Sequence, residues 1–284
     1  MKGSSLGGAL FARLQYILPQ HGISRLVRAA TRVRMPWFKN LLTRGFLALY
    51  RVDLAEAAEP DPFRHEDFNR FFTRALKADA RPIDAHADAV ASPVDGTVSE
   101  CGAIEGDRLL QAKGRRYTLG ELLAAQDWAR RFEGGSFATI YLAPYDYHRI
   151  HMPLDGRLVD ALYVPGRLFS VNAATARHVP RLFARNERIL TLFAGPAGEF
   201  ALVMVGALNV GSMATVWSGD VAPRERRVAR LPHADVALAK GAELGRFNMG
   251  STVILLFEPK RVRWAPHLAP GAVVRMGQAI GGFA

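Results

Sequence analysis

The sequence predicts an α+β fold, in which N-terminal amphipathic helices are followed by a mainly antiparallel β-sheet or sandwich core. Three observations support this prediction. Residues 1–50 contain eight Lys and Arg and no Asp or Glu, interleaved with apolar residues. From Asp61 onward, short apolar runs alternate with Gly, Pro and Asp turns. The 284 residues are 49% hydrophobic and 22% charged, so the chain can bury a full core.

Residues 1–60 are predicted to form a basic, helical membrane-association segment. Pro19 and Pro36 mark the breaks between short helices. Basic residues such as Arg25 and Arg28 share one helical face, while apolar residues occupy another. Packing on a domain would explain any one of these helices. Three in succession without an acidic residue favour contact with an anionic membrane surface.

The charge balance narrows the choice of partners. A net charge of +11 predicts attraction to anionic partners. Nucleic acid is not expected, because no RNA-binding aromatic signature, helix-turn-helix or zinc finger accompanies the charge.

The single cysteine, Cys101, excludes an internal disulfide and a multi-cysteine metal site. The uncharged residues 200–219 contain Gly and polar interruptions, so they predict two buried strands or a hairpin rather than a membrane span.

Residues 61–284 are predicted to form a second, mainly β domain. Two helices are expected in it, over residues 68–76 and 118–131, the latter with a capping box from Thr118 to Glu121. The predicted strands span residues 91–98, 137–142, 156–163, 189–194, 200–205, 213–217 and 253–257.

Two segments at strand ends carry candidate acid–base residues. Asp95 lies in an Asp-Gly pair, which by itself indicates a turn. His148 and His151 lie in residues 141–153, between two prolines, and are candidates for general acid–base roles. Arg149 lies between the two histidines and would repel a cation, so no metal site is expected.

A third segment carries a candidate nucleophile, Ser251, where a turn runs into an apolar strand. Asp95, His151 and Ser251 can converge as orienting carboxylate, base and nucleophile. The chain lacks a Gly-x-Ser-x-Gly elbow at this serine, which argues against an ordinary α/β-hydrolase. Gly250 precedes the serine directly, and glycine tolerates strained backbone angles. We therefore expect the Ser251 hydroxyl to attack the Gly250 carbonyl, which is self-cleavage chemistry.

From Phe68 to the C-terminus, the chain resembles the phosphatidylserine decarboxylase proenzymes, pyruvoyl-dependent enzymes that make phosphatidylethanolamine. One departure is Met249, where the bacterial pattern carries Leu, and the similar volumes predict little consequence. The matching blocks are residues 71–74, 92–97, 141–153, 164–166, 168–172, 183–188, 205–211 and 250–252.

The resemblance implies roles for the candidate residues. His151 would remove the Ser251 hydroxyl proton while Asp95 orients the imidazole, and the chain would break between Gly250 and Ser251. His148 would act in decarboxylation. In addition, Ser170 and Asn172 are candidate contacts of the substrate headgroup, with hydrogen bonding at a strand end as the alternative.

The products of cleavage would be a β subunit, residues 1–250, and a 34-residue α subunit, residues 251–284. The implied cofactor is a covalent pyruvoyl group derived from Ser251, which forms a Schiff base with the amine of phosphatidylserine. The expected partners are phosphatidylserine in an anionic membrane and a homo-oligomer of the paired subunits. The expected location is peripheral, on the cytoplasmic side of the cell membrane.

Three alternatives remain open at this point. A pyruvoyl-dependent amino-acid decarboxylase would share the Gly-Ser step without needing the basic segment. A Ser-His-Asp hydrolase would use the same residues and leave the chain intact. Residues 271–281 resemble the closing strands of a non-catalytic hammerhead carrier module, but the sequence lacks the Met-Lys-Met-like turn that such a module requires.

Overall fold

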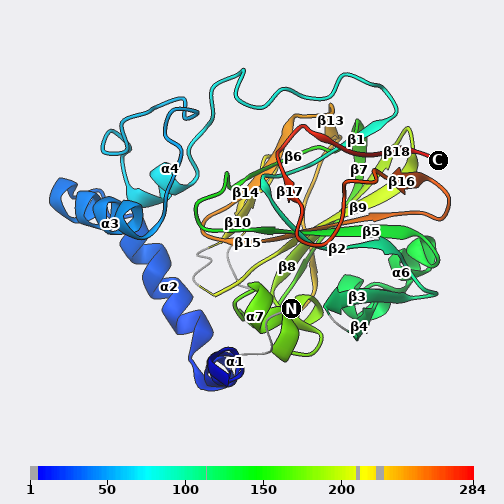
Figure 1. Ribbon diagram of the computed structural model, residues 1–284, viewed down its shortest axis with the longest axis horizontal. Helices are drawn as coiled ribbons and strands as arrows, with labels where there is room; N and C mark the ends of the chain where they lie inside the picture. The colour runs from blue at the N-terminus through cyan, green and yellow to red at the C-terminus, as the bar shows by residue number, and fades with distance from the viewer. Residues whose placement is uncertain (1–5, 113, 209–211, 222–226) are drawn as a thin grey trace.

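The computed structural model describes residues 6–112, 114–208, 212–221 and 227–284, and it confirms the predicted α+β class (Figure 1). Within these ranges the helices are α1 (Leu6–Ile17), α2 (Gln20–Thr31), α3 (Pro36–Leu49), α4 (Phe68–Phe72), α5 (Leu119–Leu123), α6 (Gln126–Phe132), α7 (Ala173–His178) and α8 (Leu182–Arg185).

The described β-strands form one large antiparallel sheet and three smaller ones. The large sheet has the order β12-β7-β8-β9-β15-β5-β2-β17, with β13 also beside β7. Its strands are β12 (Ala229–Arg230), β7 (Gly156–Val164), β8 (Arg188–Gly195), β9 (Gly198–Val205), β15 (Ser251–Phe257), β5 (Ser136–Leu142), β2 (Gly96–Ala103), β17 (Val273–Val274) and β13 (Ala237–Leu238).

The three smaller sheets have the orders β11-β10-β14-β6, β1-β18-β16 and β3-β4. Their strands are β11 (Gly219–Val221), β10 (Met213–Thr215), β14 (Glu243–Phe247), β6 (Arg149–His151), β1 (Ala89–Ala91), β18 (Ala279–Phe283), β16 (Val262–Trp264), β3 (Arg108–Ala112) and β4 (Arg115–Thr118).

Strand β15 runs through the hydrophobic core. It pairs with β9 on one side and β5 on the other, and all its residues are buried. Aromatic rings continue the core across the sheet: Phe200 stacks on Phe193, with ring centroids 5.4 Å apart, and on Phe257, at 5.7 Å. Since Ser251 is the first residue of β15, the candidate nucleophile is placed by a fully buried strand.

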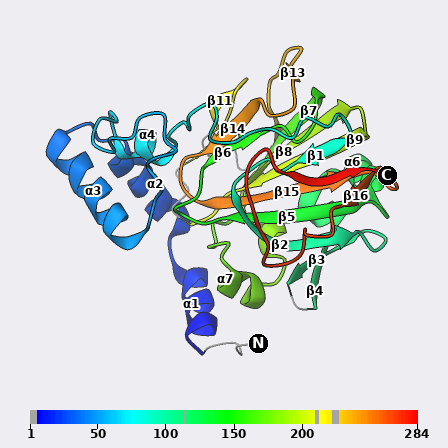
Figure 2. The ribbon, with the colours of Figure 1, turned by 45° about the horizontal axis from the view of Figure 1, so that its top comes forward.

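The three N-terminal helices lie along one side of the molecule, away from the C-terminus (Figure 2). Helix α1 packs against α7, where Gln15 donates a hydrogen bond to the Thr175 hydroxyl. Arg32, the C-cap residue of α2, forms an ion pair with Asp220 at 2.8 Å. From α3, Phe46 joins the aromatic side chains of α4. Each of these helices therefore packs one face against the rest of the chain.

The opposite faces of α1 to α3 carry exposed apolar side chains. Within the described ranges, none of the helices is long and apolar enough to cross a membrane. The exposed large apolar residues between Leu10 and Leu49 are Leu10, Phe11, Leu14, Tyr16, Ile17, Leu18, Leu26, Met35, Trp37, Leu41 and Leu49.

Three local predictions need correction. The helix expected over residues 68–76 ends at Phe72, and the one expected over 118–131 is divided by Ala124, whose φ of 51° is left-handed. The expected strand 91–98 is two strands, β1 and β2, which belong to different sheets. The prediction of two buried strands or a hairpin over residues 200–219 is confirmed in its first form, because β9 and β10 are buried and lie in different sheets.

Candidate functional site

One end of the large sheet gathers the candidate segments. Ser251 on β15 pairs with Leu142 on β5, and Tyr141 pairs with Thr97 on β2. Asp95 precedes β2 directly, so it lies at the same end, two strands from Ser251. A side chain at Gly96 would meet the Tyr141 carbonyl oxygen at 2.4 Å, which explains the glycine after Asp95.

The histidine segment reaches this end through a second pair of strands. After β5, residues 143–148 lead into β6, and β6 pairs with β14. The Phe247 amide donates to the His148 carbonyl at 3.0 Å, just before the chain passes through Gly250 to Ser251. The connection that carries His148 therefore lies beside the one that carries the predicted scissile bond.

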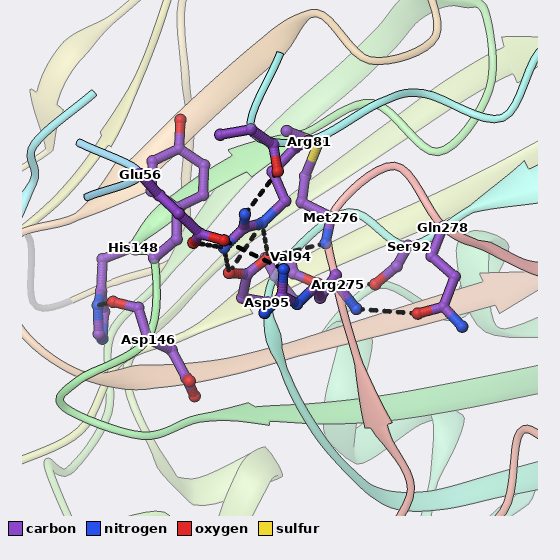
Figure 3. A network of polar contacts seen from close by, with 12 residues as sticks. Glu56, Arg81, Ser92, Val94, Asp95, Asp146, His148, Arg275, Met276 and Gln278 are labelled. Carbon is purple, nitrogen blue, oxygen red and sulfur yellow. Dashed lines mark hydrogen bonds and ion pairs between the residues drawn. The ribbon is translucent and has the colours of Figure 1, made fainter. Parts of the chain in front are cut away.

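Asp95 is held by an arginine that the sequence reasoning missed. Arg81 donates from Nε to Asp95 Oδ1 at 2.9 Å and from Nη2 to Oδ2 at 2.6 Å (Figure 3). The Met276 amide donates to Oδ1 at 2.8 Å, and Glu56 accepts from Arg81 Nη2 at 2.8 Å. Burial opposes the charge of Arg81, but the hydrogen bonds to the two carboxylates raise its pKa.

His151 is engaged at both ring nitrogens. Its Nδ1 lies 2.7 Å from the Gly241 carbonyl, which accepts only from a protonated nitrogen, so the neutral ring keeps its lone pair on Nε2. That lone pair faces the Tyr147 hydroxyl at 3.1 Å. The His151 amide donates to the Pro93 carbonyl at 2.8 Å, which ties the residue to the turn of Asp95. Burial lowers the pKa of His151, so the ring is neutral at neutral pH.

His148 keeps a lone pair available. It is fully buried, its ring centroid lies 4.2 Å from that of Phe72, and its Nδ1 donates to the Asp146 carbonyl at 2.8 Å. Its Nε2 has no hydrogen-bond partner among the described residues. Burial lowers the pKa of His148 to about 3. A neutral imidazole with a buried lone pair can accept or return a proton in a site that excludes water.

Ser251 is buried, and its Oγ has no hydrogen-bond partner in the described part of the chain. The backbone strain in this segment lies at Met249, which has φ = 127°. Gly250 does not have a positive φ, and a side chain there would meet no described atom within 4 Å. Attack of Ser251 on the Gly250 carbonyl stays a prediction.

The structure thus brings Asp95, His151, Ser251 and His148 to one region without joining them in a hydrogen-bonded relay. Asp95 bonds Arg81, and His151 bonds Tyr147. The triad therefore stays a prediction. No group of three or more potential metal ligands occurs within the residues described.

The two candidate headgroup contacts lie beside α1 and α7. The Ser170 amide donates to Gln15 Oε1 at 2.7 Å, and the Asn172 side chain caps α7 by accepting from the Thr175 amide at 2.9 Å. Both residues therefore have structural roles, and their contact with substrate stays a prediction. Residues 209–211 of the matching block 205–211 lie outside the described residues.

Known proteins match this chain over nearly its full length. A family model described as phosphatidylserine decarboxylase matches residues 68–282, and a second, described as PSD, matches residues 10–51. Proteins named phosphatidylserine decarboxylase proenzyme from Methylococcus capsulatus and Pseudomonas fluorescens are 51% and 52% identical, over 96% of this chain and 96% of theirs. One from Azotobacter vinelandii is 51% identical over 96% of this chain and 97% of its own. The chain therefore belongs to the phosphatidylserine decarboxylase family.

Proposed function

We propose that this protein converts phosphatidylserine to phosphatidylethanolamine and CO2 by means of a pyruvoyl group generated at Ser251. The observation that carries the proposal is the Ser251 hydroxyl, which is buried without a partner among the described residues at the start of β15. Buried polar atoms are normally hydrogen-bonded, so a hydroxyl without a partner among the described residues, at the sheet end that also gathers the histidine segment, favours a chemical role. The family membership supplies the substrate class.

Self-cleavage would begin with attack of Ser251 Oγ on the Gly250 carbonyl carbon. The peptide C–N bond breaks as the C–O bond forms, and the liberated amine keeps the chain from Ser251 onward. Loss of the Ser251 Cα proton then expels the Gly250 carboxylate, which leaves dehydroalanine. Water adds to it and ammonia departs, so the new N-terminus is a pyruvoyl group. The first proton would pass to His151, whose tautomer already leaves Nε2 basic once Tyr147 moves aside.

The pyruvoyl ketone supplies an electrophile that condenses with the substrate amine and accepts the electron pair released as CO2 leaves. The residues around Ser251 fit such a group, because the site is buried and already contains an unpartnered polar atom. His148 would accept a proton at Nε2 from the substrate ammonium as it condenses with the ketone, and would then return that proton to the carbon that loses CO2. Its neutral state follows from burial against Phe72.

Cleavage would leave the two subunits locked together. Strand β15 would stay paired with β9 and β5, both of the larger subunit. The Met276 amide would keep its hydrogen bond to Asp95 across the subunits. A homo-oligomer of this pair stays a prediction.

The N-terminal helices would hold the site at a membrane surface. Their exposed apolar side chains include Leu26, Trp37 and Leu41, which are 60 to 71% exposed. The same segment carries only basic charges through Tyr50. Apolar contact with the acyl boundary and attraction to anionic headgroups act together in such segments. The cytoplasmic side of the membrane stays a prediction.

The test is an assay of purified protein with phosphatidylserine in anionic vesicles. We expect phosphatidylethanolamine and CO2 in equal amounts, and no product from Ser251→Ala at the same concentration. Free serine serves as the second substrate, because a decarboxylase of free amino acids would prefer it. Release of free serine or of fatty acid instead of CO2 would contradict the proposal.

A further inference from the structure

Arg74 is a buried arginine whose guanidinium has no hydrogen-bonding or charged partner among the residues described. The residue is 5% exposed, and its Nε is buried without a hydrogen bond. Its guanidinium carbon lies 5.8 Å from the centre of the Phe71 ring. The other arginines buried to this degree differ. Arg81 bonds two carboxylates, and Arg188 donates to four backbone carbonyls.

An unpaired guanidinium in this position is costly. Arginine stays protonated in proteins, so Arg74 cannot lose its charge to escape burial. Removing an ion from water without a partner is strongly unfavourable even after relaxation. Burial lowers the pKa of Arg74, and the charge of Asp95 only partly offsets this effect. The fold therefore holds a positive charge that has no hydrogen-bond or ion-pair partner among the residues described.

Arg74 faces the candidate site. It lines a cavity of about 220 Å³ together with Asp95, Asp146 and Tyr147. Its charge also contributes to lowering the pKa of His148, after the larger effect of burial. Figure 3 shows Asp146 and His148 on one side of Asp95. An anion in this cavity could contact Arg74 close to Asp95, one of the residues proposed for catalysis.

We propose that Arg74 binds the phosphodiester of the phosphatidylserine headgroup, an inference that rests on the proposed function. The planar guanidinium matches two phosphate oxygens at once. The substrate carboxylate is the poorer partner, because it loses its charge as CO2 departs. An ion pair there would stabilise the ground state more than the transition state and slow the reaction. The phosphodiester keeps its charge throughout the reaction, so an ion pair with it stabilises the ground state and the transition state equally and does not slow decarboxylation.

The experiment uses the full-length, matured protein with Arg74→Gln and Arg74→Lys. Arg70→Gln is the matched control, since Arg70 is an exposed arginine four residues earlier and its loss changes the net charge equally. Rates are expressed per pyruvoyl group, counted by hydrazide labelling. Two constants are measured for each variant: KM for phosphatidylserine, and the inhibition constant of phosphatidylethanolamine, which has the phosphodiester but lacks the carboxylate.

We expect Arg74→Gln to raise both constants by the same factor, about 10- to 100-fold, with a smaller change in kcat. Arg74→Lys should fall between this variant and the wild type, and Arg70→Gln should match the wild type. A raised KM with an unchanged inhibition constant would overturn the inference and assign Arg74 to the carboxylate. The inference would also be overturned if both constants stayed unchanged. It would likewise be overturned if both Arg74 variants failed to mature while Arg70→Gln matured. An inactive wild-type protein would instead contradict the proposed function.

Discussion

The ion pair between Arg81 and Asp95 should contribute more stability than any other contact of its network, and Arg81→Met tests this directly. Both side chains are buried, with 7% of Arg81 and 11% of Asp95 exposed. Removing one partner of a buried pair leaves an uncompensated charge, which costs about 3–5 kcal/mol. Methionine keeps an apolar chain in place of the aliphatic part of arginine, so loss of packing contributes less than it would with alanine.

The same network contains a built-in comparison. Arg275 bonds Glu56 at 3.1 Å, but 64% of its side chain is exposed. Exposed ion pairs contribute about 0–1 kcal/mol, so Arg275→Met should cost no more than that. The double variant Arg81→Met/Asp95→Asn should recover part of the loss, because it removes both buried charges.

The assay is urea unfolding of the full chain, followed by circular dichroism. All variants carry Ser251→Ala, which keeps the chain in one piece and the unfolding transition interpretable. A loss below about 1 kcal/mol for Arg81→Met, or no recovery in the double variant, would refute this reasoning. It would mean that the Met276 amide and water satisfy Asp95 without the arginine.

Three further predictions concern pH, strain and membrane contact. Between about pH 3 and 6.5, the free energy of unfolding should rise with pH, because His148 binds a proton in the unfolded chain but not in the folded one. In urea titrations, His148→Gln should lower the slope of the unfolding free energy against pH by up to about 1.4 kcal/mol per pH unit. Met249→Gly should lengthen the half-time of self-cleavage, followed on denaturing gels, at least about fivefold, because the glycine relieves about 1–3 kcal/mol of backbone strain that scission would release. An unchanged half-time would show that this strain does not accelerate cleavage. Replacing Trp37 and Leu41 by Ser should weaken flotation with anionic vesicles, whereas the exposed Val159→Ser on β7 should not; equal flotation of all variants would exclude these helices as the contact.

Local sequence patterns predicted the strands and the helix start that depend mainly on neighbouring residues. Alternating and continuous apolar runs place β5, β7, β8 and β9 within two residues of their observed ends. The capping box of Thr118 and Glu121 is confirmed, with both of its hydrogen bonds formed. The break at Ala124 was not predictable, because a left-handed alanine carries no sequence signal of its own.

Contacts between segments far apart in the sequence determine the features that the sequence did not predict. The segment 91–98 divides because Ser92 bonds Gln278 and Gly277, near the C-terminus, while β2 pairs with β5. Arg81 lies 14 residues from Asp95, in a stretch with no recognisable motif, so its pairing was not foreseeable.

Within the candidate site, the sequence located the segments and the structure assigned their contacts. His148 and His151 are indistinguishable by spacing. In the described part of the chain, however, His148 Nε2 has no hydrogen-bond partner, whereas His151 bonds Tyr147. Arg74 lay within a matching block, but its burial without a described partner emerges only from packing.

The central claim is that Ser251 becomes a pyruvoyl group, and an intact mass measured under denaturing conditions, with and without a carbonyl-reactive hydrazide, tests it most directly. The account predicts two fragments divided between Gly250 and Ser251. The 34-residue fragment should carry one hydrazide and lack the free amine. A single unlabelled chain that nevertheless decarboxylates phosphatidylserine would contradict the account, because the activity would then not depend on the proposed group.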